Sequence, residues 1–239
     1  MSSEFRFKQF TIRQEHTAMK VGTDGVLLGA WAQPKEAFSI LDIGTGTGLI
    51  ALQLAQKTYA EVVDALEIEG SAYEQAVENF EQSDWGDRLF CYHASFNEFV
   101  SEMEGEEYDF IISNPPFYTS TVKEDTVESA RVKARHVESL SYEELIEGTT
   151  KLLSEKGECA FIIPFKEEVS FLEIASNYNL FPNRITRVKG TEKAEIKRSL
   201  LQLSFQEVKR ELSELVIEIE RHVYTKEYID LVEDFYLKM

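Results

Sequence analysis

An apolar run passes abruptly into glycines at Leu41-Asp42-Ile43-Gly44-Thr45-Gly46-Thr47-Gly48. The next residues, 49–57, have helical spacing, so the glycines join a predicted strand to a predicted helix. Glycines at such a junction let the backbone turn tightly and let a ligand approach main-chain N–H groups. The spacing G-x-G-x-G is neither the G-x-G-x-x-G of dinucleotide enzymes nor a G-K-[ST] phosphate loop. Taken alone, the glycines fit a ligand site and an empty tight turn about equally well.

Strands alternate with helices around this loop, which predicts an α/β fold with a parallel sheet. The predicted strands are 39–43, 61–67, 89–93, 108–113 and 158–163, and the predicted helices are 49–57, 71–82 and 141–153. After Pro182 the pattern changes. Residues 184–189 and 199–206 predict a hairpin at the sheet edge, 215–220 a further exposed strand, and Thr225 the cap of a last helix.

The second predicted strand ends in Glu67, where a carboxylate can accept hydrogen bonds from both hydroxyls of a ribose. A surface glutamate is the alternative, and Glu67 alone would not exclude it. Asp42, the three spaced glycines and Glu67 together resemble the motifs of class I S-adenosylmethionine-dependent methyltransferases. The resemblance implies S-adenosylmethionine as cofactor. It also implies a Rossmann-like, mostly parallel seven-stranded sheet with helices on both faces and an antiparallel C-terminal edge.

The fourth predicted strand runs into Ser113-Asn114-Pro115-Pro116-Phe117. Two consecutive prolines fix φ twice and remove two N–H donors, which predicts a rigid loop. An exocyclic amino nitrogen is a poor nucleophile because its lone pair is delocalised into the ring. The Asn114 side-chain oxygen and the Pro115 carbonyl can accept its two hydrogens and stabilise the positive charge that develops during methyl transfer. Phe117 offers a stacking face, and the run resembles the [DNS]-P-P-[FYW] motif of amino-group methyltransferases.

Both ends of the chain carry a further resemblance. Before the glycines stands Lys20-Val21-Gly22-Thr23-Asp24-Gly25-Val26-Leu27-Leu28-Gly29, and the tail contains Tyr224-Thr225-Lys226-Glu227-Tyr228-Ile229. These segments resemble the bacterial tRNA (adenine-N6)-methyltransferases that modify valine tRNA beside the anticodon, from about residue 5 to 239. The resemblance implies direct methyl transfer to N6 of an adenine in the anticodon loop, with tRNA as the partner.

The resemblance also assigns residues. The implied catalytic residues are Asn114, Pro115, Pro116 and Phe117, and the implied cofactor contacts are Asp24, Asp42, Gly44, Thr45, Gly46, Gly48, Glu67, Ser95, Phe96 and Asn114. Such enzymes usually place an acid after the third strand, against the cofactor's adenine. This chain has Ser95 there, a neutral acceptor. One domain is expected over 1–239, with a capping segment (1–36), a cofactor-binding core (37–165) and the C-terminal edge strands and helix (166–239).

Two other functions stay open. Methylation of a release-factor glutamine at N5, or of another RNA or DNA amino group, uses a similar motif, although the release-factor enzymes usually carry tyrosine at the Phe117 position. They also have a separate helical N-terminal domain. A binding module without turnover is the non-enzymatic alternative, which the intact Asn114 and glycine loop disfavour.

The charge is strongly negative, at −18, with 43 acidic and 25 basic residues. This excludes attachment to nucleic acid or anionic membranes by bulk charge, because phosphate binding rests on Lys and Arg. The charge is uneven: residues 57–113 hold fifteen acids and two bases, whereas residues 184–198 hold six bases and two acids. The expected RNA contacts are Arg13, Lys133, Arg135, His136, Arg187, Lys189, Lys197 and Arg198.

Two cysteines are too few for a disulfide framework, and their spacing matches no metal motif. The first residues lack the apolar core of a signal peptide, and no apolar run approaches the length of a membrane span. We therefore expect a cytoplasmic protein without metal or membrane attachment. We also expect a monomer, although no sequence pattern points to an oligomeric state.

Overall fold

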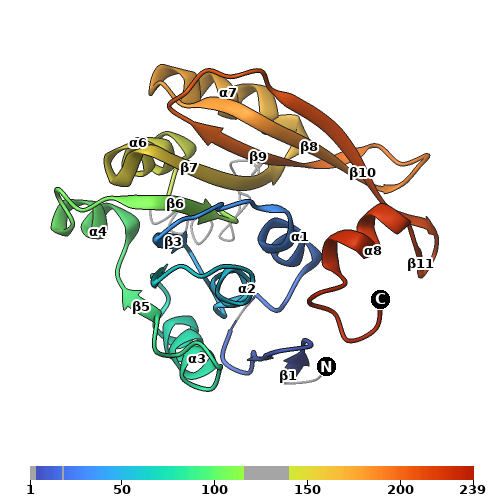
Figure 1. Ribbon diagram of the computed structural model, residues 1–239, viewed down its shortest axis with the longest axis horizontal. Coiled ribbons are helices and arrows are strands. Elements are labelled where there is room, and N and C mark those ends of the chain that lie inside the picture. Colours follow the sequence, from blue (N-terminus) through green and yellow to red (C-terminus); the bar gives the residue numbers. More distant parts are fainter. Residues whose placement is uncertain (1–3, 18, 116–139) are drawn as a thin grey trace, which may run out of the picture.

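Nine strands form one sheet in the computed structural model, which describes residues 4–17, 19–115 and 140–239 (Figure 1). Their order is β11-β10-β8-β9-β7-β6-β3-β4-β5. The strands span Ser39–Ile43 (β3), Val62–Glu67 (β4), Leu89–His93 (β5), Tyr108–Ser113 (β6), Leu153–Pro164 (β7), Phe181–Thr191 (β8), Ile196–Ser204 (β9), Glu211–Glu220 (β10) and Val223–Tyr224 (β11). A separate two-stranded hairpin pairs β1 (Glu4–Arg6) with β2 (Thr11–Arg13).

The sheet changes direction at β9. Strands β5, β4, β3, β6 and β7 run parallel to one another, and β9 is antiparallel to both β7 and β8. The expected mostly parallel sheet and edge hairpin are thereby confirmed. The described sheet is wider than the seven strands expected, because β10 adds in parallel to β8 and β11 adds to β10.

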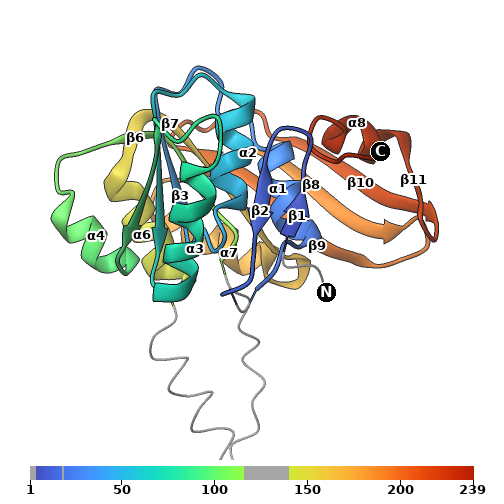
Figure 2. The ribbon, with the colours of Figure 1, turned by 90° about the horizontal axis from the view of Figure 1, so that it is seen from below.

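Helices cover both faces of the sheet (Figures 1 and 2). One face carries α1 (Thr23–Trp31), α2 (Leu49–Lys57), α3 (Gly70–Glu81) and α8 (Lys226–Val232), and the other carries α4 (Phe96–Glu102), α6 (Tyr142–Leu152) and α7 (Glu168–Asn177). Successive side chains of a strand point to opposite faces. Ile40 accordingly packs with the first group of helices and Leu41 with the second, so two apolar cores enclose the sheet.

Helix α1, which was not predicted from the sequence, packs tightly against α2. Its Gly29 leaves no room for a side chain, because a Cβ there would lie 2.4 Å from the Gln53 side chain. At its end Trp31 donates from Nε1 to Thr186 Oγ1 at 2.8 Å, and the Arg184 guanidinium lies 4.3 Å from the Trp31 ring. Helix α1 is thus fixed to the sheet by β8, a strand from late in the sequence.

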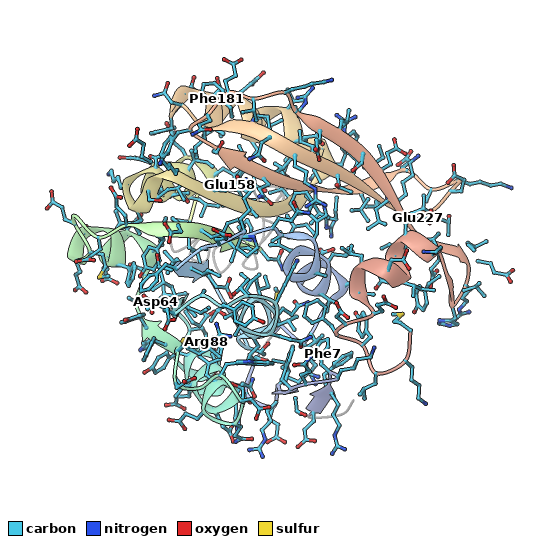
Figure 3. All side chains as sticks on the ribbon, viewed as in Figure 1. Phe7, Asp64, Arg88, Glu158, Phe181 and Glu227 are labelled. Atoms are coloured by element: carbon cyan, nitrogen blue, oxygen red, sulfur yellow. The ribbon has the colours of Figure 1, made fainter. Side chains whose placement is uncertain are left out.

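The two basic residues of the acidic stretch have structural roles. Lys57 donates to the carbonyls of Gly29, Ala30 and Ala32 at the end of α1. Arg88, labelled in Figure 3, donates to carbonyls of Ala55, Thr58 and Ala60 at the end of α2. Helix ends leave carbonyls without intrahelical partners, and cations satisfy them well. Neither base is available to bind a phosphate.

Candidate functional site

The glycine loop joins β3 to α2 and turns with three left-handed residues, Gly44 (φ 70°), Gly46 (φ 59°) and Gly48 (φ 83°). A Cβ on Gly44 or Gly46 would meet no described atom within 4 Å, so these two glycines border open space. A Cβ on Gly48 would lie 2.4 Å from the Phe80 ring. The first two glycines therefore serve a ligand-sized space, whereas the third serves helix packing.

Asp42 fixes the loop from below. It is fully buried, and its Oδ2 accepts hydrogen bonds from Thr45 Oγ1 at 2.6 Å and from the Ala51 N–H at 3.2 Å. Its Oδ1 has no hydrogen-bond partner among the described residues. Burial raises the pKa of Asp42 to about 7, and the neighbouring carboxylate of Glu67 adds to the rise. Asp42 therefore holds the loop from inside the fold.

Glu67, the last residue of β4, is hydrogen-bonded to the glycine loop. Its Oε2 accepts from the Gly46 N–H at 2.8 Å, and its Oε1 accepts from the Glu69 N–H at 2.9 Å. The Thr45 N–H also bonds to the carbonyl of Leu66, which precedes Glu67. Each carboxylate oxygen can accept two hydrogen bonds, so Glu67 keeps capacity for two hydroxyl donors. The ribose contact itself stays a prediction.

Asn114 lies beside the glycine loop. Ile43 and Ser113 are paired in neighbouring parallel strands, so Gly44 and Asn114 leave the sheet at the same level. They line one cavity of about 710 Å³, together with Asp24, Thr45, Gly46, Pro115 and Arg198. Cavities of this size hold ligands well above the size of a single amino acid. The structure thus brings the two principal motifs of the sequence into one site.

Two of the residues that line this cavity form an ion pair. Asp24, from the first turn of α1, accepts a hydrogen bond from Arg198 Nε of β9 at 2.8 Å, and both side chains are about 30% exposed. From the sequence, Asp24 was expected to contact the cofactor and Arg198 to contact RNA. The structure joins these two residues in one ion pair.

Sequence reasoning missed Asn79, which is almost fully buried in α3. Its Nδ2 donates to the carbonyl of Thr47 in the glycine loop and to that of Arg13 in β2, and its Oδ1 accepts from the Arg13 N–H. Asn79 therefore holds the N-terminal segment against the loop. The only signal in the sequence is an amide on the inward face of a helix, a face that also carries Gln75. Its partners lie 66 and 32 residues away.

Two expected cofactor contacts have roles in the fold. Ser95 forms a capping box with Glu98 at the start of α4, which occupies its hydroxyl. Phe96 is 6% exposed and packs against Gly148 of α6, where a Cβ would lie 2.4 Å from the ring. Neither residue lines the cavity that holds Asn114, and neither do the buried Asp42, Gly48 and Glu67 that support its loop.

The expected RNA contacts differ in their surroundings. Arg187 pairs with Glu168, Lys189 with Glu214, and Arg13 with Glu78, whereas Lys197 is exposed. Five assigned residues lie outside the described residues: Pro116, Phe117, Lys133, Arg135 and His136. Arg187 and Lys189 would have to exchange a carboxylate for a phosphate in order to contact RNA.

Within the described residues, none of the helices is long and apolar enough to cross a membrane. The same part of the chain has no group of three or more metal-ligating side chains.

Known proteins resemble this chain over almost its whole length. The methyltransferase small domain matches residues 18–172. A protein of Christiangramia forsetii named tRNA1(Val) (adenine(37)-N6)-methyltransferase is 62% identical, with 98% of both chains covered. Proteins of the same name from Flavobacterium johnsoniae and Trichodesmium erythraeum are 60% and 45% identical, and each comparison covers at least 98% of both chains.

Solved structures of other proteins share the fold of this chain. A predicted O-methyltransferase of Agrobacterium tumefaciens superposes with a TM-score of 0.68 at 18% identity, covering 89% of this chain and 96% of that chain. Pyrococcus horikoshii TYW2, solved in complex with MeSAdo, superposes with a TM-score of 0.57 at 16% identity, covering 84% of this chain and 69% of that one. The full-length sequence matches and this common fold establish that the chain belongs to the family of tRNA1(Val) (adenine(37)-N6)-methyltransferases.

Proposed function

We propose that this protein transfers a methyl group from S-adenosylmethionine to N6 of an adenine in the anticodon loop of a valine tRNA. The observation that carries the proposal is the shared cavity of Asn114 and the glycine loop. The names of the full-length relatives supply the substrate. They favour tRNA over a release factor.

The cavity and the loop beside it fit the cofactor. Gly44 and Gly46 leave open space beside the backbone, Glu67 keeps acceptor capacity at the loop, and the buried Asp42 holds the loop through Thr45 and Ala51. When bound, S-adenosylmethionine supplies a methyl group on a positively charged sulfur. We assign the loop and Asp42 to its methionine part, Glu67 to its ribose, and Asp24 to the mouth of the pocket.

Asn114 and Pro115 act on the substrate amine. The Asn114 side-chain oxygen and the Pro115 carbonyl accept the two hydrogens of N6, which draws the nitrogen towards tetrahedral geometry. The same two acceptors stabilise the positive charge that develops on the nitrogen. The methylated nitrogen then loses a proton to solvent, so no protein base is needed before attack. The adenine must leave its stack to reach Asn114, which costs less in a loop than in a duplex.

The remaining assignments complete the proposal. Phe117 stacks on the adenine and Pro116 stiffens the motif, while the RNA is held by Lys133, Arg135, His136 and the basic residues of β8 and β9. The whole chain works as one catalytic domain and as a monomer. It acts in the cytoplasm, where tRNA is modified, without a metal.

The test is methyl transfer from labelled cofactor to unmodified valine tRNA. Label should appear in N6-methyladenosine, and a matched tRNA with guanine at the target position should stay unlabelled. The release-factor protein serves as the competing substrate. Label in the release factor alone, or label in the guanine-substituted tRNA, would contradict the proposed function.

A further inference from the structure

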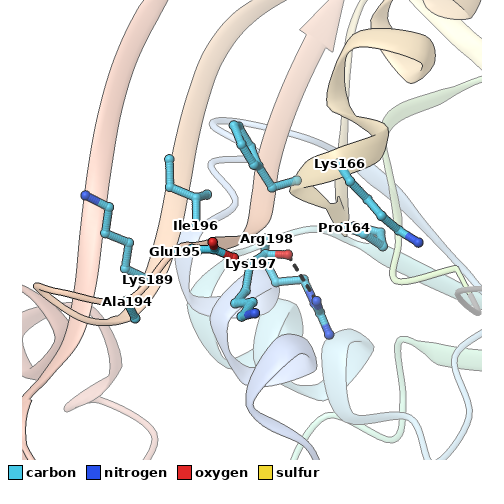
Figure 4. A pocket seen from close by; sticks show the side chains of 9 residues that line it. Pro164, Lys166, Lys189, Ala194, Glu195, Ile196, Lys197 and Arg198 are labelled. Carbon is cyan, nitrogen blue, oxygen red and sulfur yellow. Dashed lines mark hydrogen bonds between the residues drawn. The ribbon is translucent and has the colours of Figure 1, made fainter.

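A second cavity, of about 700 Å³, shares Arg198 with the one that holds Asn114, and Figure 4 draws its lining. Residues 164–166 at the end of β7, residues 194–198 leading into β9, and Lys189 of β8 line it. Pro164 is paired with Arg198 across the two strands, and Arg198 also lines the first cavity. The two cavities therefore meet at Arg198, beside the end of β7, which is the strand that neighbours β6.

Cations dominate this second cavity. Lys166, Lys189, Lys197 and Arg198 line it together with one acid, Glu195. In Figure 4 Lys166 and Lys189 stand at opposite sides, with Lys197 and Arg198 between them. Lys166 and Lys197 are exposed, and the Lys166 ammonium lies 3.6 Å from the Glu167 carboxylate. In a protein of charge −18, such a concentration of cations beside the expected active site favours a phosphate-bearing ligand.

An aromatic ring completes the lining. Phe165 begins a short 3₁₀ turn, Phe165–Glu167, and is only partly buried. The Arg187 guanidinium lies 5.2 Å from its ring centroid. Arg187 is itself fixed by two-pronged hydrogen bonds to Glu168, at 3.1 and 2.6 Å, and Ser199 donates to the same buried carboxylate. The ring thus rests on a rigid support, so stacking on it costs little conformational entropy.

We propose that this cavity is a subsite for the nucleotide next to the target adenine, with Phe165 stacking on its base and Lys166 and Lys197 contacting its phosphate. The inference rests on the proposed function. An aromatic platform beside cations is the combination that binds single-stranded nucleic acid. Extruding the adenine removes its stacking on the neighbouring base, and Phe165 replaces that lost contact. Arg198, at the junction of the cavities, lies between the two nucleotides.

The experiment is a double-mutant cycle between Phe165 and the RNA. Wild-type protein and Phe165→Ala are assayed on an anticodon stem-loop and on two matched stem-loops that lack the base on one or the other side of the target. Phe165→Ala should lower kcat/KM on the intact RNA by roughly 5- to 150-fold, the range for loss of one stacked base. On the RNA that lacks the contacted base it should have little further effect, and Phe165→Trp should restore activity on intact RNA.

The matched control is Tyr59→Ala, because Tyr59 is fully exposed in the loop after α2, remote from both cavities. It should leave every rate unchanged. Losses that simply add in the cycle would overturn the stacking role. So would unchanged activity in Phe165→Leu, which keeps apolar packing against Arg187 but offers no aromatic face.

The phosphate contact is tested separately. Lys166→Ala and Lys197→Ala should each reduce the salt dependence of RNA binding, and unchanged salt dependence in both would overturn the phosphate contact. Wild-type protein that fails on the intact stem-loop would instead contradict the proposed function.

Discussion

The glycine loop and the basic turn, which we define as Lys189, Lys197 and Arg198 where β8 passes into β9, lie at the same end of the parallel strands, but they are built in opposite ways. In the loop, main-chain N–H groups and two buried carboxylates are tied together by short hydrogen bonds. In the turn, long cationic side chains extend from an exposed hairpin, and several are paired with acids. The first region is suited to one small ligand of fixed shape, and the second to a polyanion whose contacts adapt.

This difference leads to separable effects of substitution. Changes in the loop should alter cofactor affinity or folding and be insensitive to salt. Changes in the turn should alter RNA affinity in a salt-dependent manner. Asn114 lies between the two regions and should affect neither affinity strongly.

The largest effect is expected for Asn114→Ala. Loss of the amide oxygen removes one of two acceptors for the developing positive charge, so kcat should fall by about 10²–10³. Single-turnover methylation and calorimetric titration of cofactor measure the two quantities. Cofactor binding should stay nearly intact. An equal loss of both would place Asn114 in cofactor binding and remove the distinction.

Gly46→Ala and Gly48→Ala should distinguish a glycine that leaves space for the cofactor from a glycine that allows helix packing. A Cβ on Gly46 enters the open space of the cavity, so cofactor affinity should fall about tenfold or more, equivalent to about 1.4 kcal/mol. A Cβ on Gly48 meets Phe80, so Gly48→Ala should lower the Tm more than Gly46→Ala does. Equal Tm losses with equal cofactor affinities would mean that the loop serves packing alone.

Asp42→Asn tests the buried carboxylate. The folded-state pKa of Asp42 is about 7, above its unfolded value of 3.8, so the folded protein binds more protons between these values. The contribution of Asp42 to stability therefore falls as pH rises through this window and is constant above it. At pH 8 the Asn variant should be more stable by on the order of 1–3 kcal/mol, and the gain should shrink towards pH 4. It should also bind the cofactor less tightly. A gain that is independent of pH would rule out Asp42 as the titrating group.

The smallest effects are expected in the basic turn. Lys197→Ala should raise KM for tRNA a few-fold and reduce the salt slope by about 1, without altering cofactor affinity. Arg198→Ala should have the same effect on tRNA and should also weaken cofactor binding, because Asp24 loses its partner. Identical cofactor titrations of the two variants would show that the Asp24–Arg198 pair does not support the cofactor site.

Local patterns were sufficient for much of the fold. The helix at 49–57 was predicted with the bounds that α2 has, and Thr225 does cap α8, accepting from the Tyr228 N–H. Strand β7 was predicted to start at 158 but starts at Leu153, because its early residues pair in an irregular register with β6. Helices α1, α4 and α7 were not predicted. Helix α1 is buried almost throughout, so it lacks the polar face that makes a helix visible in sequence.

The site could be located from its motifs, but its internal contacts could not. The sequence predicted where the motif residues lie, because each stands at or next to the end of a strand: Asp42, the glycines, Glu67 and Asn114. The Asp24–Arg198 pair joins residues 174 apart, and it depends on how β9 folds back beside β7. Phe165 was likewise overlooked, although it follows the strand next to Asn114. Such contacts arise from sheet order, which periodicity does not encode.

The position of α1 has a consequence for synthesis of the chain. This helix emerges early from the ribosome, yet Trp31 bonds to Thr186 and Asp24 pairs with Arg198. The lysine that closes its carbonyl end, Lys57, is available sooner, but the late strands are translated last. Translation must therefore be nearly complete before the mouth of the cofactor pocket can form. A nascent or prematurely terminated chain should have no complete pocket, so methyl transfer is coupled to completion of the polypeptide.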